Sequence, residues 1–223
     1  MRFFVLFFAL SYAFLAATAA LAQARAQARA EAQFHAQARS KTRVICTILA
    51  DVDRKRPLIQ QGDCGNRISP ASTFKIAIAL MGYDAGVLKN ADQPLLPFKK
   101  GYVDWRPEWR KPAFPASWMR ESVVWYSQQI TKQLGESQFA GYVKAFGYGN
   151  QDLSGDPGKG NGLTDAWLSS SLQISPLEQI TFLEKLVRRE LPVSGRAYDM
   201  TARITDYGLQ PSGWRIHGKT GAG

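Results

Sequence analysis

The sequence predicts an α/β protein of the α+β type, in which both ends of the chain build an antiparallel sheet and a helical lobe lies between them. Two observations predict this class. β-Branched, apolar segments lie near both ends of the chain, whereas the middle carries apolar residues at helical spacing. The length of 223 residues and the hydrophobic content of 45% suffice for one globular domain with its own core.

Residues 1–22 have the pattern of a secretory signal peptide. A short positive start precedes an apolar run from Phe3 to Leu21, which ends in an A-x-A cleavage site closing at Ala22. The run is long enough for an uncleaved membrane anchor, which is the alternative, but we expect export without a stable anchor. Residues 23–41, rich in Ala, Gln and Arg, are predicted to be a solvated linker or frayed helix, and residues 42–223 the domain.

Periodicity and turn residues predict the elements of the domain in order. The helix that begins at Ser72 is apolar nearly all round, which is typical of a buried central helix. The segment Ser175-Pro176-Leu177-Glu178 has the capping-box pattern, with proline at the first helical position. The predicted elements are a strand at 42–52, a hairpin or turn at 54–66, a helix at 72–88, irregular structure at 89–115, a helix at 115–134, a loop at 151–162, a helix after Ser175 and a strand at 212–223.

Charge, cysteine and histidine content exclude several classes of function. The formal net charge is +10, but the basic residues are scattered, so we interpret them as a solvated surface and expect no nucleic-acid partner. The two cysteines, Cys46 and Cys64, can pair in an exported protein, and two buried free thiols are the alternative. With only two histidines, we expect no metal site, and a Ser-His-Asp triad is disfavoured.

The segment SPASTFKIAIALMGY, residues 69–83, places a lysine inside an apolar helix. Lys75 follows Ser72 by three residues, so both side chains lie on one helix face. Burial disfavours the charged ammonium and lowers the pKa of the lysine, and a neutral lysine can act as the base for the serine. Backbone N–H groups at the helix start can also polarise a bound carbonyl. For this pattern alone, the alternative is a lysine that snorkels to the surface.

Further motifs follow in order along the chain. Ser122-Val123-Val124 lies within the second predicted helix, Tyr148-Gly149-Asn150 follows a short apolar stretch, and Lys219-Thr220-Gly221 lies on the last predicted strand. The trio S-x-x-K, S-x-(N or V) and K-T-G marks serine β-lactamases and penicillin-binding proteins. Together with Trp167, these motifs closely resemble the class D β-lactamases, the oxacillinases, over about residues 42–223.

The resemblance implies a serine β-lactamase/penicillin-binding transpeptidase fold and a role for each motif. Ser72 is the implied acylated nucleophile, Lys75 the implied carrier of a CO2-derived carbamate that acts as general base, and Ser122 the implied proton donor to the departing lactam nitrogen. The backbone N–H groups of Ser72 and Ala222 would form the oxyanion hole. The Tyr-Gly-Asn motif is expected to be structural. The implied substrate-binding residues are Lys219 and Thr220 at the substrate carboxylate, Gly221, Ala222, Val124 in an apolar wall, and Trp167 as hydrogen-bond donor to the carbamate.

The implied activity is hydrolysis of penicillin-type antibiotics in the bacterial periplasm, with no other cofactor. One alternative is a non-hydrolysing β-lactam sensor or penicillin-binding domain of the same fold, and another is a basic exported binding protein without catalysis. In the family, a further strand and a C-terminal helix follow K-T-G and carry an arginine that binds the substrate carboxylate. We therefore expect the last strand and the C-terminal helix to be missing here, and the sequence assigns no residue to that arginine's role.

Overall fold

The computed structural model describes residues 23, 25–27, 29, 46–54 and 57–222. The chain divides into two units, residues 1–44 and 45–223. The described residues of the first unit are helical and exposed, whereas the predicted signal peptide lies outside the described residues. None of the helices in the described part of the chain has both the length and the hydropathy of a membrane span. The following concerns the second unit.

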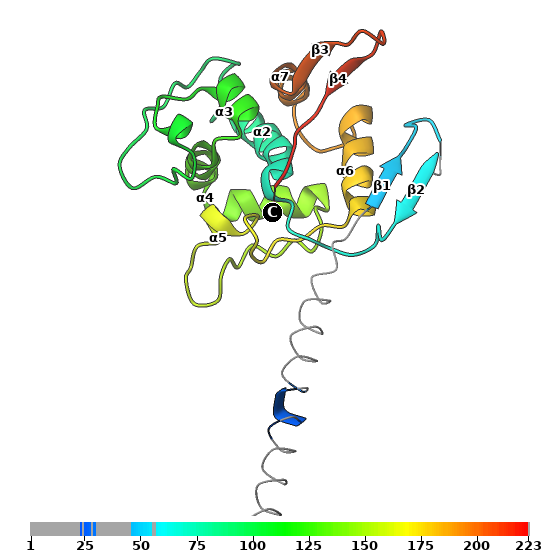
Figure 1. Cartoon of the computed structure of the whole chain (residues 1–223). Coiled ribbons are helices and arrows are strands. Elements are labelled where there is room, and N and C mark those ends of the chain that lie inside the picture. Colours follow the sequence, from blue (N-terminus) through cyan, green and yellow to red (C-terminus); the bar gives the residue numbers. More distant parts are fainter. Residues whose placement is uncertain (1–22, 24, 28, 30–45, 55–56, 223) are drawn as a thin grey trace, which may run out of the picture. The chain divides into compact units, whose positions relative to one another are not determined.

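Helices make up most of this unit, and short strands lie beside them (Figure 1). This mixture of helices with small antiparallel sheets confirms the predicted α+β class. In chain order the elements are β1 (Cys46–Leu49), β2 (Ile59–Gly62), the 3-10 turn η1 (Ala71–Phe74), α2 (Lys75–Asp84), the 3-10 turn η2 (Pro107–Trp109), α3 (Pro115–Glu121), α4 (Val124–Phe146), α5 (Gly162–Asp165), α6 (Pro176–Arg188), α7 (Gly195–Ile204), β3 (Asp206–Leu209) and β4 (Arg215–His217).

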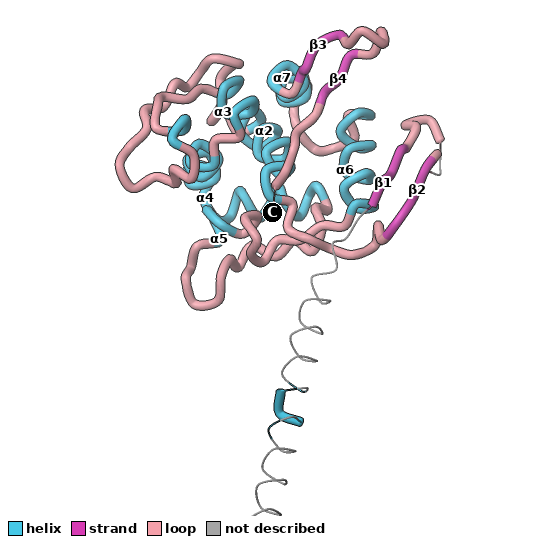
Figure 2. Tube along the Cα trace, in the orientation of Figure 1, coloured by secondary structure: helices cyan, strands magenta, loops and turns pink. Residues whose placement is uncertain are grey.

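The strands form two antiparallel pairs, which corrects the prediction of one sheet shared by both chain ends. β1 pairs with β2, with Cys46 opposite Gly62, and β3 pairs with β4, with Asp206 opposite His217. No ladder joins the two pairs among the described residues. The reason is that different helices hold them: β1 contacts α6, whereas β3 follows directly on α7 (Figure 2).

A disulfide between Cys46 and Cys64 ties the β1–β2 hairpin together, so the predicted pairing is confirmed over two free thiols. Cys46 begins β1 and Cys64 follows the end of β2. The backbone carbonyl of Cys64 accepts a hydrogen bond from the N–H of Leu177 at 3.2 Å. The hairpin is thereby attached to the first turn of α6.

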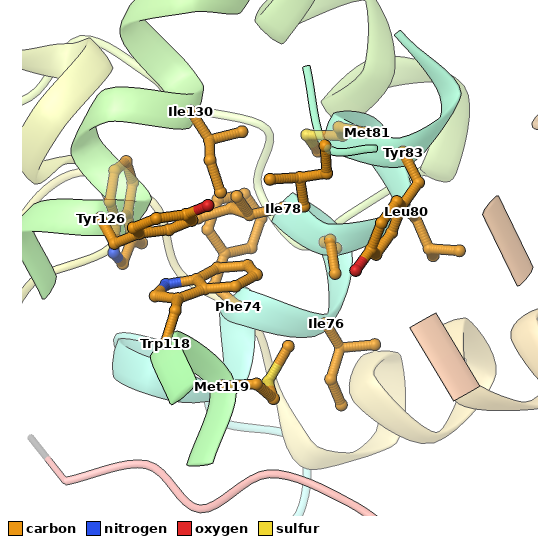
Figure 3. Close-up of a cluster of buried hydrophobic side chains, with 14 of the residues drawn as sticks. Phe74, Ile76, Ile78, Leu80, Met81, Tyr83, Trp118, Met119, Tyr126 and Ile130 are labelled. Atoms are coloured by element: carbon orange, nitrogen blue, oxygen red, sulfur yellow. The ribbon is translucent and has the colours of Figure 1, made fainter. Parts of the chain in front are cut away.

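α2 is the central helix of the core, as the sequence predicts. All residues from Lys75 to Tyr83 are buried, because the segment carries apolar side chains on every face and therefore needs neighbours all round. α4 and α7 contact it, and Figure 3 shows side chains of η1, α2, α3 and α4 in one cluster, including Phe74, Ile78, Trp118 and Tyr126. The regular helix begins at Lys75, and Ser72 lies in the preceding 3-10 turn.

A break between α3 and α4 corrects the prediction of one helix over residues 115–134. Ser122 adopts a left-handed backbone conformation, with φ 62° and ψ 33°, and ends α3. The N–H of Val123 then bonds the carbonyl of Trp118 at 3.1 Å, and α4 starts at Val124. The apolar spacing continues across the break, and neither glycine nor proline marks it, so the helical pattern concealed it.

The last predicted strand, residues 212–223, is also shorter than expected. β4 comprises only Arg215–His217, so the K-T-G motif lies beyond its end. The last strand pair joins His217 to Asp206, and one further bond in the same register, from the N–H of Gly218 to the carbonyl of Thr205 at 3.0 Å, follows it. The motif therefore leaves the strand as an extended segment without a ladder among the described residues.

The capping box predicted at the start of α6 is present. The Ser175 hydroxyl accepts from the N–H of Glu178 at 3.2 Å, and the Glu178 carboxylate accepts from the N–H of Ser175 at 2.9 Å. Arg67 also donates to this carboxylate, and its hydrogen bond lowers the pKa of Glu178 to about 2. The same glutamate thus caps α6 and joins it to the chain before the central helix.

Candidate active site

Ser72 and Lys75 lie together at the start of the central helix. Ser72 is in η1, and Lys75 is the first residue of α2. The Nζ of Lys75 lies 3.3 Å from the Oγ of Ser72, within hydrogen-bonding distance. The predicted proximity of the two side chains is confirmed. Together they provide a hydroxyl nucleophile with an adjacent nitrogen base.

The environment of Lys75 favours its neutral form. The side chain is completely buried, which excludes the alternative of a lysine that snorkels to the surface. Burial, and to a smaller extent the positive charge of Lys219, lowers the pKa of Lys75 to about 7. At neutral pH a substantial fraction of the amine therefore has a free lone pair that can accept a proton.

The backbone immediately before the nucleophile is strained. Ala71 has φ 47°, in the left-handed region that residues other than glycine rarely adopt. Such a conformation costs on the order of 1 kcal/mol, and strain of this kind gathers at functional sites. The N–H of Ala71 bonds the carbonyl of Trp167 at 3.0 Å, and the hydroxyl of Ser69 bonds the same carbonyl at 2.8 Å. These bonds fix the turn that carries Ser72.

Trp167 packs directly against this turn and has an unpaired indole N–H. Its ring centroid lies 5.7 Å from that of Phe74 and 6.2 Å from that of Phe139. The side chain is completely buried, and its Nε1 has no hydrogen-bond partner among the described residues. A buried donor without an acceptor costs about 1–3 kcal/mol. This N–H therefore marks a position where an acceptor fits.

The K-T-G segment passes alongside the turn of the nucleophile. A Cβ at Gly221 would lie 3.0 Å from the Cγ2 of Thr73 and 3.2 Å from the carbonyl oxygen of Pro70. Glycine permits this close approach of the two main chains. Ala222 is the next residue, so the sequence-predicted oxyanion donors, the N–H groups of Ser72 and Ala222, belong to neighbouring segments.

Lys219 supplies a second positive charge to the site. It is partly buried, and its Nζ donates to the carbonyl and the hydroxyl of Thr220 at 2.9 and 3.2 Å. Burial, and then the positive charge of Arg106, lowers the pKa of Lys219. Because Lys219 also lowers the pKa of Lys75, its charge acts on the Ser72–Lys75 pair.

Ser122 and Val124 occupy the junction of α3 and α4. Ser122 is partly buried, and the side chain of Val124 is buried. Among the described residues, no hydrogen bond joins Ser122 to Ser72 or Lys75. The left-handed backbone of Ser122 turns its side chain out of the helical row in which the sequence placed it. Ser122 thus lies between two helices, and in the described part of the chain it makes no hydrogen bond to the nucleophile.

The Tyr-Gly-Asn motif supports the site from within the core. Tyr148 is completely buried, and its ring centroid lies 4.9 Å from that of Phe74, in the turn of the nucleophile. The side-chain oxygen of Asn150 accepts from the N–H of Gln173 at 2.9 Å. Gly149 has φ 55°, and a Cβ there would overlap the carbonyl oxygen of Gln173. These contacts are structural, as the sequence predicts.

The structure adds a basic and aromatic segment that the sequence motifs do not indicate. Trp109 is buried, and its Nε1 donates to the carbonyl of Glu121 at 3.1 Å, immediately before the Ser-Val-Val motif. The guanidinium carbon of Arg106 lies 5.8 Å from the centre of the Trp109 ring. The hydrogen bond from Trp109 thus attaches this segment to the end of α3. In the sequence, the tryptophan and proline content of residues 89–115 predicts irregular structure but gives no indication that Trp109 is buried.

Comparison with known proteins places this site in a family. A family model described as the penicillin binding protein transpeptidase domain matches residues 17–223. The crystal structure of the OXA-427 class D β-lactamase shares 53% sequence identity and a TM-score of 0.76, over 79% of this chain and 72% of that chain. The chain belongs to the class D β-lactamase family. This confirms the family and the fold that the motifs predict, and all predicted site residues lie within the matched region.

Curated class D relatives match the same part of the chain. β-Lactamase OXA-9 of Klebsiella pneumoniae is 49% identical over 180 residues, and β-lactamase OXA-1 of Escherichia coli is 43% identical over 183 residues. Each alignment covers 80% of this chain but only 65% and 64% of the respective relative. The chain thus spans a little under two thirds of the length of these class D relatives.

Proposed function

We propose that the protein hydrolyses the β-lactam ring of penicillin-type antibiotics through an acyl-enzyme on Ser72. The observation that carries the proposal is the completely buried Lys75, whose Nζ lies 3.3 Å from the Ser72 hydroxyl and whose pKa is about 7. A general base is most effective when its pKa lies near the working pH. The relatives named as β-lactamases support the same reaction class.

The acylation step follows from the positions of the chain's own groups. The Ser72 oxygen attacks the lactam carbonyl carbon while the base at Lys75 takes the hydroxyl proton. The carbon–nitrogen bond of the ring breaks, and Ser122 passes this proton from the base at Lys75 to the departing nitrogen while its own hydroxyl is restored. The backbone N–H groups of Ser72 and Ala222 stabilise the negative charge that develops on the carbonyl oxygen.

Substrate binding is assigned to the K-T-G segment. Lys219 provides a positive charge, and Thr220 provides a hydroxyl for the substrate carboxylate. The hydrogen bonds from the Nζ of Lys219 to the carbonyl and hydroxyl oxygens of Thr220 keep the ammonium and the hydroxyl next to each other. Val124, buried at the start of α4, forms part of the apolar wall.

We extend the proposal to a carbamate on Lys75. A neutral amine can add to the carbon of CO2 and lose one proton, and the low pKa of Lys75 keeps the amine available for this addition. The buried, unpaired indole N–H of Trp167 fits a carbamate oxygen, because an indole nitrogen is a donor only. When present, the carbamate supplies a general base for acylation and for hydrolysis of the acyl-enzyme.

The proposal includes export to the bacterial periplasm. The signal-peptide pattern of residues 1–22 supports it. The disulfide between Cys46 and Cys64 also supports it, because disulfides persist in oxidising compartments such as the periplasm.

The test is penicillin turnover by the purified protein, with and without added bicarbonate, beside the Ser72→Ala variant. We expect many turnovers per protein molecule, a faster rate with bicarbonate, and no turnover by the variant. A single stoichiometric acylation without turnover would favour a β-lactam sensor over a hydrolase. Turnover that survives Ser72→Ala would overturn the assignment of the nucleophile.

A further inference from the structure

We infer that Ser69 is a positioning residue for the proposed reaction: its hydroxyl joins the main chain of Trp167 to the turn that carries Ser72. The inference rests on the proposed function and deepens it, because Trp167 supplies the indole N–H that would bind the carbamate on Lys75. Ser69 lies outside the S-x-x-K motif and outside every later motif of the sequence. Three observations carry the inference: the hydrogen bonds of the Ser69 hydroxyl, the backbone conformations that they join, and the absence of a polar contact from the Trp167 side chain among the described residues.

The first observation is that the Ser69 hydroxyl uses its full hydrogen-bonding capacity. It donates to the carbonyl of Trp167 at 2.8 Å and accepts from the N–H of Ser169 at 2.9 Å. The N–H of Ala71, whose shorter bond goes to the Trp167 carbonyl, also lies 3.4 Å from the hydroxyl oxygen. A hydroxyl has one proton to donate and two lone pairs. Because Trp167 and Ser169 lie 98 and 100 residues away in the sequence, this one side chain joins two distant segments.

The second observation is that these bonds join two residues in strained backbone conformations. Ala71 has φ 47° and Ser169 has φ 58°, so both lie in the left-handed region although neither is glycine. Such conformations persist only where the surrounding contacts impose them. Ala71 directly precedes Ser72, and Ser169 follows Trp167 by two residues. The Ser69 hydroxyl therefore fixes the main chain on both sides of the contact between the tryptophan segment and the turn of the nucleophile.

The third observation is that the position of the Trp167 indole depends on its main chain. The buried Nε1 has no hydrogen-bond partner among the described residues, and the ring packs against two phenylalanines. Apolar packing is non-directional, whereas the carbonyl of Trp167 accepts two directed bonds, from the Ser69 hydroxyl and from the N–H of Ala71. The direction of the indole N–H relative to Lys75 therefore depends on this main-chain attachment.

A second attachment keeps the two segments together when the hydroxyl is removed. The backbones of Ile68 and Ile174 form an isolated antiparallel bridge, with N–H to carbonyl bonds of 3.1 and 2.9 Å. This bridge uses main-chain groups only, so Ser69→Ala leaves it in place. We therefore expect the variant to fold but to displace Trp167, because one bond to its carbonyl and the bond to Ser169 are lost.

The test measures the carbamate directly in the wild type and in Ser69→Ala, by NMR with isotope-labelled bicarbonate before any penicillin is added. We expect Ser69→Ala to need about ten times more bicarbonate for half of the lysine carbamate signal, because a displaced indole no longer donates to a charged acceptor. Penicillin kinetics at limiting bicarbonate should show a similar fall in kcat, with little change in KM.

Two conservative variants test whether the hydroxyl itself is responsible. Ser69→Thr keeps the hydroxyl and should restore most of the wild-type behaviour. Ser69→Cys keeps a weaker donor and acceptor and should give an intermediate bicarbonate requirement, which tests the inference even where the alanine variant does not fold. A threonine variant that needs as much bicarbonate as the alanine variant would overturn the role of the hydroxyl.

Ser171→Ala is the matched control. Like Ser69, Ser171 donates to a carbonyl, that of Asp152, and accepts from a backbone N–H, that of Gly155, both at 2.9 Å. Neither partner belongs to the turn that carries Ser72. Both alanine variants should lower the midpoint of urea unfolding by a similar amount, whereas only Ser69→Ala should change the bicarbonate requirement. An unchanged requirement in Ser69→Ala, or an equal rise in Ser171→Ala, would overturn the inference.

Two outcomes in the wild type separate this inference from the proposed function. A wild type that turns over penicillin without a carbamate signal would overturn the inference and leave Ser72 as the nucleophile. A wild type that never forms an adduct at Ser72 would overturn the proposed function, and the inference with it.

Discussion

Replacement of Lys75 by methionine should stabilise the fold near neutral pH while it abolishes turnover. Methionine matches the length of the lysine stem and fills the same apolar space without a charge. In the folded protein the pKa of Lys75 is about 7, against an ordinary value of 10.5. The fold therefore disfavours the protonated form of this completely buried side chain.

The size and sign of the effect follow from proton linkage. Between pH 7 and pH 10.5 the unfolded chain keeps the Lys75 proton that the folded chain has lost, so the free energy of unfolding of the wild type rises with pH. The destabilisation is complete below pH 7, at about 5 kcal/mol on the scale of about 1.4 kcal/mol per pKa unit between 10.5 and about 7. It vanishes above pH 10.5. Loss of the hydrogen bond to Ser72 opposes the gain by about 1 kcal/mol at all pH values.

The assay is urea unfolding of wild type and Lys75→Met in CO2-free buffer at several pH values from 6 to 11. The advantage of the variant should be about 4 kcal/mol at pH 6–7 and should fall steadily towards zero or below by pH 10.5. All other titrating groups are common to both proteins and cancel in the difference. A stability difference that is the same at every pH would refute the conclusion that the buried lysine is held mostly neutral.

Three further predictions concern the scaffold around the site. Replacing both Cys46 and Cys64 by alanine should cost about 3 kcal/mol of unfolding free energy, and a reductant should then have no further effect in denaturant titrations. Gly149→Ala should cost more than 2 kcal/mol, because its Cβ would overlap a backbone carbonyl. The control Gly158→Ala, also at positive φ but with open space around it, should cost about 1 kcal/mol in the same titration. The Asp84 carboxylate accepts from a tyrosine hydroxyl and a backbone N–H, and these bonds lower its pKa. The melting temperature should therefore fall with decreasing pH as the Asp84 carboxylate is protonated. In Asp84→Asn the melting temperature should depend less on pH in the acidic range. An unchanged pH dependence in the variant would contradict a stabilising role of the ionised Asp84.

Features that depend on local chemistry were predictable from the sequence. The capping box at Ser175 was predictable because its hydrogen bonds join residues three apart. The buried central helix followed from its apolar side chains on all faces, and the proximity of Ser72 and Lys75 followed from their spacing. In each case neighbours in the chain decide the structure.

Features that depend on contacts without a sequence pattern of their own were not predictable. The break at Ser122 lies in a segment whose apolar spacing continues, and a carbonyl one turn earlier, at Trp118, stabilises it. Beyond the end of β4, one bond from Gly218 to Thr205 continues the pairing that joins His217 to Asp206. The position of Arg106 depends on the packing of Trp109 against the end of α3. No local pattern in the sequence encodes these three contacts.

The most direct test of the central claim is the mass of the peptide that contains Ser72, followed over time after the protein is mixed with penicillin. The account predicts that this peptide gains the mass of one intact penicillin, because ring opening adds the whole molecule to the hydroxyl, and that the adduct then disappears as substrate is exhausted. An adduct on another peptide, or hydrolysis of penicillin without any adduct at Ser72 under rapid quenching, would contradict it.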